Sequence, residues 1–418
     1  MGGKPQTQTS QVPPVSPLRP GKERPQVPQV SPLRPGKAIL LTSLITLTAC
    51  RPHDFPQYPA NYREYAYVTN GGSNTVSIYD VVNVRLDREL PVGQNPVAVA
   101  ASTTRNEVYV VNSGAPGGQG SVTVINAENN SVVAAIPVKR RPGAIALAPH
   151  GDLAYVANSA SNNISVIDLK ARREVAVIGT GEEPAALRVS PDGKTLAVAN
   201  RRGNSVSLID PETDQVRAVF EGCPGASDIV ILPDSSKAFA ACSAGHQIMA
   251  IALAHSAGKP AAANPAQPDS EEALIDVGHQ PVQLALKPDG GEIFVLNSQS
   301  DSISEVITGT DDVQGAYLMG ADPVYGLVSA DNALIYVANL RSQEVSIYAI
   351  DDGKRAGAIR VGDGPSALAF SAAGHLLFVV DAGSGDVAVV RTASHSLFTL
   401  LPAGRNPNAI AVKAFKLP

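Results

Sequence analysis

The sequence has 418 residues, with 36 glycines, 33 prolines, no tryptophan and 17% charged side chains. Short apolar runs recur between Gly, Pro, Asn and Asp clusters and no long segment has helical periodicity, which predicts an all-β chain with many turns. The net charge is −5; the six Lys/Arg and one acidic residue of residues 1–49 leave 27 basic and 37 acidic residues elsewhere, a net of −10. Such an acidic body without basic stripes argues against a nucleic-acid partner.

Residues 1–49 are expected to be a leader and signal peptide. Ala38–Ala49 is an uncharged, mostly apolar run preceded by Arg34 and Lys37; it is too short for a membrane-spanning helix and suits a signal-peptide core. It ends in LTAC at residues 47–50, which resembles a bacterial lipobox. The resemblance implies that Cys50 is acylated and that the exported protein is lipid-anchored to the cell envelope, on the periplasmic side of the outer membrane or at the cell surface. An ordinary secretory signal is the alternative.

Two further segments are expected to lie outside the folded domain. The octapeptide VSPLRPGK occurs at residues 15–22 and again at 30–37, and we expect translation to start near residue 30, with an extended proline-rich tail as the alternative. Residues 50–60 contain three prolines and no periodicity, which predicts a tether.

A strand motif of the form aromatic-Val-x-Asn recurs along the rest of the chain. It is clearest at Tyr67–Asn70, Tyr109–Asn112 and Tyr155–Asn158. Degenerate copies follow at 197–200, 239–242, 294–297, 336–339 and 378–381, with spacings of 42, 46, 42, 42, 55, 42 and 42 residues. Each repeat holds four short apolar segments separated by turns, which predicts one four-stranded propeller blade per repeat.

On these motifs the chain resembles the YVTN-repeat β-propellers over about residues 61–415. These are extracytoplasmic proteins related in fold to haem-d1-type and surface-layer propellers, so the resemblance implies a β-propeller. Each inner strand is expected to open with a proline, and eight such prolines predict eight blades, with seven blades as the alternative; they are Pro96, Pro142, Pro184, Pro224, Pro281, Pro323, Pro365 and Pro407. The last one opens a C-terminal strand that has no repeat of its own, so we expect it to complete the first blade and close the ring. Residues 254–270 interrupt one blade as an Ala/Pro-rich insertion.

Cys223 and Cys242 are the only cysteines of the predicted domain. Cys223 lies at the start of one expected strand and Cys242 at the end of the next, so a hairpin between them would bring the two side chains together. In an exported protein this placement predicts a disulfide. Two separate buried thiols are the alternative.

The loops that join fourth to first strands and second to third strands share one face, where propellers bind ligands. A ring of charged residues on these loops is the candidate ligand rim, which comprises Arg140, Arg141, Arg201, Arg202, His246, His279, Arg341 and Arg405. An ordinary solvated loop surface is the alternative. The repeated Asn is expected to cap backbone donors in the loop that follows it.

No motif indicates an enzyme. The histidines are scattered and Cys-x-x-Cys-His is absent, so we expect neither a metal nor a cofactor, and no catalytic set can be assembled by spacing. The expected inner strands are apolar except for Arg188, Asp228, Gln283 and Tyr325. The favoured function is therefore a non-catalytic binding scaffold for a protein or a surface polymer. The alternative is a periplasmic lactonase, lyase or oxidoreductase with its site at the channel mouth.

Overall fold

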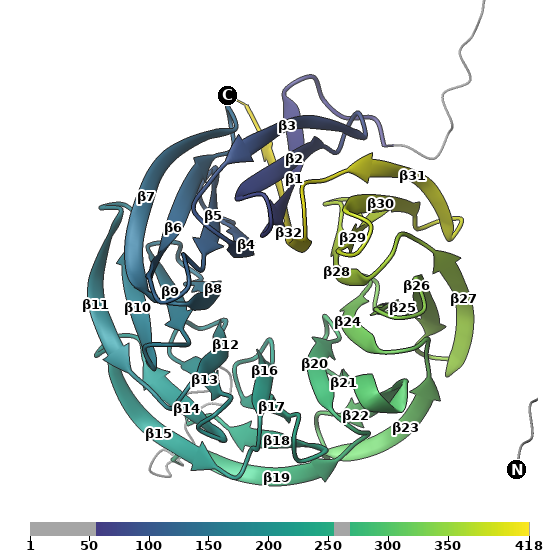
Figure 1. Ribbon diagram of the computed structural model, residues 1–418. Helices are drawn as coiled ribbons and strands as arrows, with labels where there is room; N and C mark the ends of the chain where they lie inside the picture. Colours follow the sequence, from purple (N-terminus) through teal and green to yellow (C-terminus); the bar gives the residue numbers. More distant parts are fainter. Residues whose placement is uncertain (1–55, 255–267, 418) are drawn as a thin grey trace, which may run out of the picture. The chain divides into compact units, whose positions relative to one another are not determined.

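The computed structural model describes residues 56–254 and 268–417. They form eight four-stranded antiparallel sheets arranged as the blades of a propeller (Figure 1). The prediction of eight blades is confirmed, and the seven-bladed alternative is wrong. The leader, Cys50 and most of the tether lie outside the described residues, as do residues 255–267 of the predicted insertion. Within 56–254 and 268–417, no helix is long and apolar enough to span a membrane.

We number the blades 1 to 8 along the chain. Blade 1 comprises β1 (Tyr62–Asn70), β2 (Thr75–Asp80), β3 (Arg85–Pro91) and β32 (Pro407–Lys416), and blade 2 comprises β4 (Pro96–Ala101), β5 (Glu107–Asn112), β6 (Gln119–Asn126) and β7 (Ser131–Arg140). Blade 3 comprises β8 (Pro142–Leu147), β9 (Leu153–Asn158), β10 (Asn163–Asp168) and β11 (Arg173–Gly179), and blade 4 comprises β12 (Pro184–Val189), β13 (Leu196–Asn200), β14 (Ser205–Asp210) and β15 (Gln215–Glu221). Blade 5 comprises β16 (Ala226–Ile231), β17 (Lys237–Cys242), β18 (Gln247–Ala252) and β19 (Ser270–Asp276), and blade 6 comprises β20 (Pro281–Leu286), β21 (Glu292–Asn297), β22 (Ser302–Ile307) and β23 (Asp312–Leu318). Blade 7 comprises β24 (Pro323–Val328), β25 (Leu334–Asn339), β26 (Glu344–Ala349) and β27 (Lys354–Arg360), and blade 8 comprises β28 (Pro365–Phe370), β29 (Leu376–Asp381), β30 (Asp386–Arg391) and β31 (Ser396–Pro402). A 3-10 turn (Ser298–Ser300) follows β21.

The C-terminal strand closes the ring. β32 pairs with β1 from Tyr62 opposite Lys416 to Asn70 opposite Pro407, and Leu417 N donates to Asn61 O at 2.9 Å. In Figure 1 β32 takes the innermost place of blade 1, as β4 does in blade 2. Closure in this way pairs the inner edge of β1, which would otherwise expose its backbone donors and acceptors.

The aromatic residue of each motif is part of the core. The rings of Tyr67, Tyr109, Tyr155, Phe239 and Phe294 are at most 1% exposed. Apolar side chains of neighbouring blades pack against each other, as in the cluster that joins β5 and β6 to β9 and β10. Burial of each large side chain contributes about 1.5–3 kcal/mol, so packing between blades stabilises the ring.

The repeated Asn has a structural role that differs from the expected one. In six blades its side-chain Nδ2 donates at 2.8–2.9 Å to a hydroxyl of the third strand. The six pairs are Asn70–Ser77, Asn112–Thr123, Asn158–Ser165, Asn200–Ser207, Asn297–Ser304 and Asn339–Ser346. The expectation that this residue caps loop backbone donors is therefore wrong, because the amide bonds within the sheet.

A glycine packs directly on this amide in five blades. A Cβ at the glycine would lie 2.6 or 2.7 Å from Cγ of the asparagine, closer than real Cβ atoms approach; the pairs are Gly93–Asn112, Gly181–Asn200, Gly278–Asn297, Gly320–Asn339 and Gly404–Asn70. Each glycine lies in the connection that enters the blade. We call the asparagine, its hydroxyl partner and this glycine the asparagine lock. In these five blades it ties the connection that enters the blade to the end of the second strand, beside the start of the inner strand.

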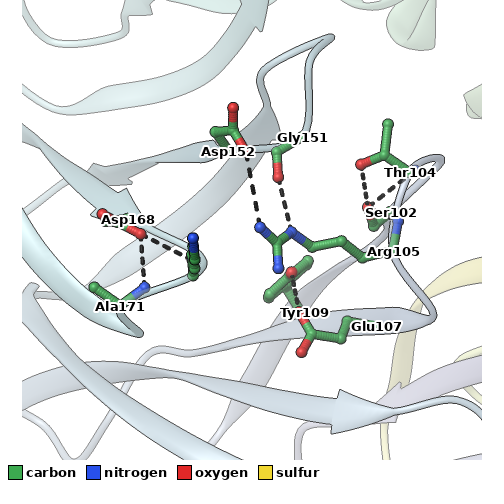
Figure 2. A network of polar contacts seen from close by, with 10 residues as sticks. Ser102, Thr104, Arg105, Glu107, Tyr109, Gly151, Asp152, Asp168 and Ala171 are labelled. Atoms are coloured by element: carbon green, nitrogen blue, oxygen red, sulfur yellow. Dashed lines mark hydrogen bonds and ion pairs between the residues drawn. The ribbon is translucent and has the colours of Figure 1, made fainter.

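Figure 2 shows a polar network between blades 2 and 3. The network lies at the opposite end of these blades from the loops of the candidate rim. Arg105 Nε donates to Gly151 O at 3.0 Å, and Tyr109 OH donates to Glu107 at 2.6 Å. Arg172 forms an ion pair with the same glutamate at 2.9 Å. These groups satisfy one another's hydrogen-bonding capacity, and two of the contacts cross the blade boundary. We therefore assign the network to the packing of blade 2 against blade 3.

Candidate functional site

Every inner strand has a β-bulge near its start, and the residue after the bulge occupies an equivalent position in all eight blades. Bulges re-aim side chains and are frequent beside active sites. Five blades carry alanine here, whereas blades 5, 6 and 7 carry polar residues; in blade order the residues are Ala409, Ala98, Ala144, Ala186, Asp228, Gln283, Tyr325 and Ala367. The repeat is therefore broken in three consecutive blades.

Arg188 adds a fourth polar side chain from blade 4. It lies two residues further along β12, at a position where every other blade has an apolar residue; these are Ala411, Ala100, Ala146, Val230, Ala285, Leu327 and Ala369. The strands β12, β16, β20 and β24 are neighbours on the inside of the ring (Figure 1). We call Arg188, Asp228, Gln283 and Tyr325 the inner polar arc.

Members of the arc interact across blade boundaries. Asp228 Oδ1 lies 3.8 Å from Nη2 of Arg188 in blade 4, while its Oδ2 accepts a hydrogen bond from Leu284 N in blade 6 at 3.0 Å. Gln283 Oε1 accepts from Gly326 N in blade 7 at 2.8 Å. The Arg188 side chain is 49% exposed and that of Asp228 is 11% exposed. The arc thus places a buried carboxylate beside a cation that solvent reaches.

The electrostatic environment suits acid–base chemistry. Burial raises the pKa of Asp228, although Arg188 and the amides of Leu284 and Ile229 partly offset the increase. Burial also raises the pKa of Tyr325, which Arg188 lowers and Asp228 raises. Asp228 is therefore a stronger base than a surface aspartate, and the Tyr325 phenol stays protonated at neutral pH.

The candidate rim residues are all exposed and lie at the end of the propeller at which the inner strands begin. Five belong to blades 4 to 7, the blades of the inner polar arc, or to the connections between them: Arg201, Arg202, His246, His279 and Arg341. Arg140 ends β7 of blade 2, and Arg141 and Arg405 lie in the connections that enter blades 3 and 1. The structure therefore divides the predicted rim into a part near the arc and a part away from it.

Several rim side chains have partners. Arg341 pairs with Asp322 at 3.2 Å, and Arg201 lies 4.0 Å from Glu183; exposed pairs of this kind contribute little to stability. The rings of His246 and His279 meet edge to face, with centroids 4.5 Å apart.

Two further observations concern metal ions and hollows near the rim. Among the described residues no group of three or more His, Cys, Asp or Glu side chains could hold a metal ion. Arg202 and Glu182 line an open depression of about 610 Å³ between blades 3 and 4.

The predicted disulfide is present between Cys223 and Cys242, with Cα atoms 4.7 Å apart. The register corrects one detail of its context. Ala226, not Pro224, pairs with Cys242 and takes the place that proline holds in the other blades. Cys223 therefore occupies the lock position of Gly181, and Cys242 that of Asn200.

Comparisons with known proteins found one family model and several solved structures to which the chain is similar. The sequence matches the model of a family of lactonases with a seven-bladed β-propeller, over residues 60–233 and 142–264. Among solved structures, the dihydro-haem d1 dehydrogenase NirN in complex with DHE has a TM-score of 0.66 at 18% identity, covering 85% of this chain and 76% of that one. A proposed 6-phosphogluconolactonase from Bacteroides uniformis has a TM-score of 0.59 at 15% identity, covering 84% and 100%. One from Bacteroides fragilis has a TM-score of 0.57 at 13% identity, covering 86% and 99%.

A search of curated proteins found no match. The structural likenesses show that the chain is a β-propeller, and its eight blades differ from the seven of the matched family.

The family match overturns the expectation of a non-catalytic binding scaffold, and with it the expectation that the chain is not an enzyme. It favours the alternative, a propeller enzyme. The expectation was wrong because it rested on the composition of each inner strand taken separately. One polar residue per strand looks minor until the strands are placed side by side, where the four residues fall on consecutive inner strands.

Proposed function

We propose that the protein is a propeller hydrolase that opens a lactone ring at the inner polar arc. The observation that carries the proposal is the break in the repeat at Arg188, Asp228, Gln283 and Tyr325, in a chain that matches a lactonase family. The inner strands of blades 1, 2, 3 and 8 carry alanine at both equivalent positions. Polar residues that interrupt such a pattern in four neighbouring blades indicate selection for chemistry rather than for packing.

The reaction is the addition of water to the ring ester. Asp228 removes a proton from water as the oxygen bonds to the carbonyl carbon, and Arg188 stabilises the negative charge that develops on the carbonyl oxygen. The bond from that carbon to the ring oxygen then breaks, and the ring oxygen takes a proton from the Tyr325 phenol. The proton on Asp228 returns to Tyr325 through solvent, which leaves one hydroxy acid per lactone and per water consumed.

Gln283 and the apolar surroundings support these roles. Gln283 holds the backbone of Gly326, next to Tyr325, at 2.8 Å. Tyr325 is half-buried and packs against the clusters that contain Ala367 and Leu368 of β28. Tyr325 is thereby held against a largely apolar wall.

The experiment is a pH-stat assay of the full-length protein against a panel of five- and six-membered lactones. Asp228→Asn and Tyr325→Phe should each lower kcat/KM by about 10²–10⁴, since each removes one proton-transfer group. Arg188→Gln should lower it by about 10²–10³. Arg173→Gln and Asp312→Asn, exposed substitutions of the same types on β11 and β23, should leave it unchanged. Equal rates for wild type and Asp228→Asn would overturn the assignment.

Three finer features belong to the proposal. The repeat is of the YVTN type, as the motifs at Tyr67–Asn70 and Tyr109–Asn112 indicate. The chain is exported and lipid-anchored through Cys50, which the LTAC sequence at residues 47–50 supports. The rim residues of blades 4 to 7 contact the part of the substrate outside the ring, because they lie on the blades that carry the arc.

A further inference from the structure

Blade 5 is built differently from the blades beside it. Cys242 stands where Asn200 and Asn297 stand in blades 4 and 6, and Cys223 stands where Gly181 stands. The hydroxyl partner is missing as well, because Met249 occupies the position of Ser207. The asparagine lock cannot form in blade 5. The disulfide between the two fully buried cysteines takes its place.

The segment between Cys223 and Asp228 is short, and its own residues do little to restrict its backbone conformation. The connection contains Gly225 at φ +68°, a conformation that glycine adopts without strain. Ala226 replaces the proline that fixes φ at the start of the neighbouring inner strands. Gly225 N bonds to Asn204 at 3.0 Å and Ser243 Oγ to Gly225 O at 2.7 Å. Without the disulfide, the start of β16 would be held only by loop hydrogen bonds such as these and by its pairing with β17.

Asp228 depends on a fixed start of β16 for both of its polar contacts. It is the first residue after the bulge of β16, and it pairs with Ala241, the neighbour of Cys242. Its carboxylate meets Leu284 N at 3.0 Å on one side and Arg188 at 3.8 Å on the other. A slip of the bulge by one residue would turn the carboxylate away from both partners, because successive strand residues point to opposite faces.

We propose that the Cys223–Cys242 disulfide is a positioning element for the site: it fixes the start of β16 and so holds the Asp228 carboxylate between Arg188 and the Leu284 amide. The proposal rests on the proposed function for its effect on catalysis. Its structural part, the placement of Asp228, does not depend on that function. Reduction of the disulfide would lower activity while the rest of the ring stays folded.

The experiment compares three forms of the full-length protein. Cys223→Ala with Cys242→Ala removes the bond without adding a polar group to a buried site. Cys223→Gly with Cys242→Asn and Met249→Ser rebuilds the asparagine lock in the form that the neighbouring blades 4 and 6 have. Wild-type protein reduced by a phosphine, with its free thiols counted by mass spectrometry, gives the same comparison as the alanine variant if that variant does not fold.

Two readouts separate this proposal from the proposed function. The first is the titration of the Asp228 carboxyl, followed by NMR of ¹³C-labelled aspartate and assigned with Asp228→Asn. The second is kcat for lactone hydrolysis. We expect loss of the bond to move the Asp228 pKa toward the ordinary value and to lower kcat about tenfold or more. The rebuilt lock should restore both.

An Asp228 titration that is the same in the oxidised, reduced and alanine forms would overturn the positioning role, whatever the activity. Absence of lactone hydrolysis in every form, with the titration shift present, would overturn the proposed function and keep the positioning role. A fall in kcat without a shift in the titration would also contradict the proposal, since it would show that the bond acts elsewhere.

Discussion

Asp381 occupies in blade 8 the position that asparagine holds in six other blades, and it makes stability depend on pH. Its side chain is fully buried, and it accepts a hydrogen bond from Gly362 N at 3.0 Å. The third-strand hydroxyl is replaced by Ala388, and Asp386 lies next to it in the register. Burial and a hydrogen bond with Asp386 raise the pKa of Asp381 from 3.8 to about 8.

The sign and size of the effect follow from this pKa. The folded protein binds the proton more tightly than the unfolded chain, so the stability that Asp381 contributes is fully present below about pH 4 and is lost as the pH rises to about 8. A shift of this size corresponds to a loss on the order of 5 kcal/mol over that range. Asp381→Asn removes the titration and supplies an amide that can donate to Asp386. The variant should therefore be more stable than wild type by about 3–5 kcal/mol at pH 8.5 and nearly equal to it at pH 4.

The assay is urea unfolding followed by circular dichroism at intervals from pH 4 to pH 9, with Asp312→Asn, an exposed substitution of the same type, as the control. The wild type and the control should lose stability through pH 5–8, and Asp381→Asn should not. Parallel curves for all three proteins would refute the reasoning, because they would show that Asp381 titrates normally in the folded state.

Three further predictions concern the lock, the ring and the anchor. Gly404→Ala should cost about 1–3 kcal/mol in thermal unfolding, because its Cβ would lie 2.7 Å from Asn70 Cγ, whereas Gly357→Ala, with no neighbouring atom within 4 Å, should cost little; equal melting of the two variants would contradict this. Deletion of residues 406–418 removes β32 and should abolish folding or lower Tm by more than about 10 °C; a truncated protein that melts within about two degrees of the intact one would show that closure is not needed. A fatty-acid analogue should label the wild type and not Cys50→Ala, and equal labelling would end the proposal of a lipid anchor.

The sequence predicted the fold because the fold is a repeat. The spacing of the motifs at Tyr67–Asn70 and its successors defines the blades, and the strand after Pro407 has no partners except those of blade 1. The disulfide was predictable for a related reason: a hairpin of known register puts the start of one strand beside the end of the next. Each of these inferences needs only contacts within one repeat or between the first and last strands of the propeller.

The inner polar arc could not be predicted in this way, because its residues come from different repeats. Asp228 and Gln283 are equivalent only when the strands are aligned on the bulge, and β16 obscures this alignment because Pro224 lies two residues ahead of the usual proline position. A signal was present nonetheless. Inner strands aligned on the last residue of each second strand show a column of alanines interrupted at Asp228, Gln283 and Tyr325.

The pH dependence of kcat/KM for lactone hydrolysis tests the central claim most directly. If Asp228 is the general base, the rate should rise with pH through a single midpoint above the ordinary aspartate value, because burial raises the pKa of this carboxyl. Asp228→Asn should abolish that limb, leaving a low rate that no longer depends on pH. An acidic limb that persists with the same midpoint in Asp228→Asn would contradict the account.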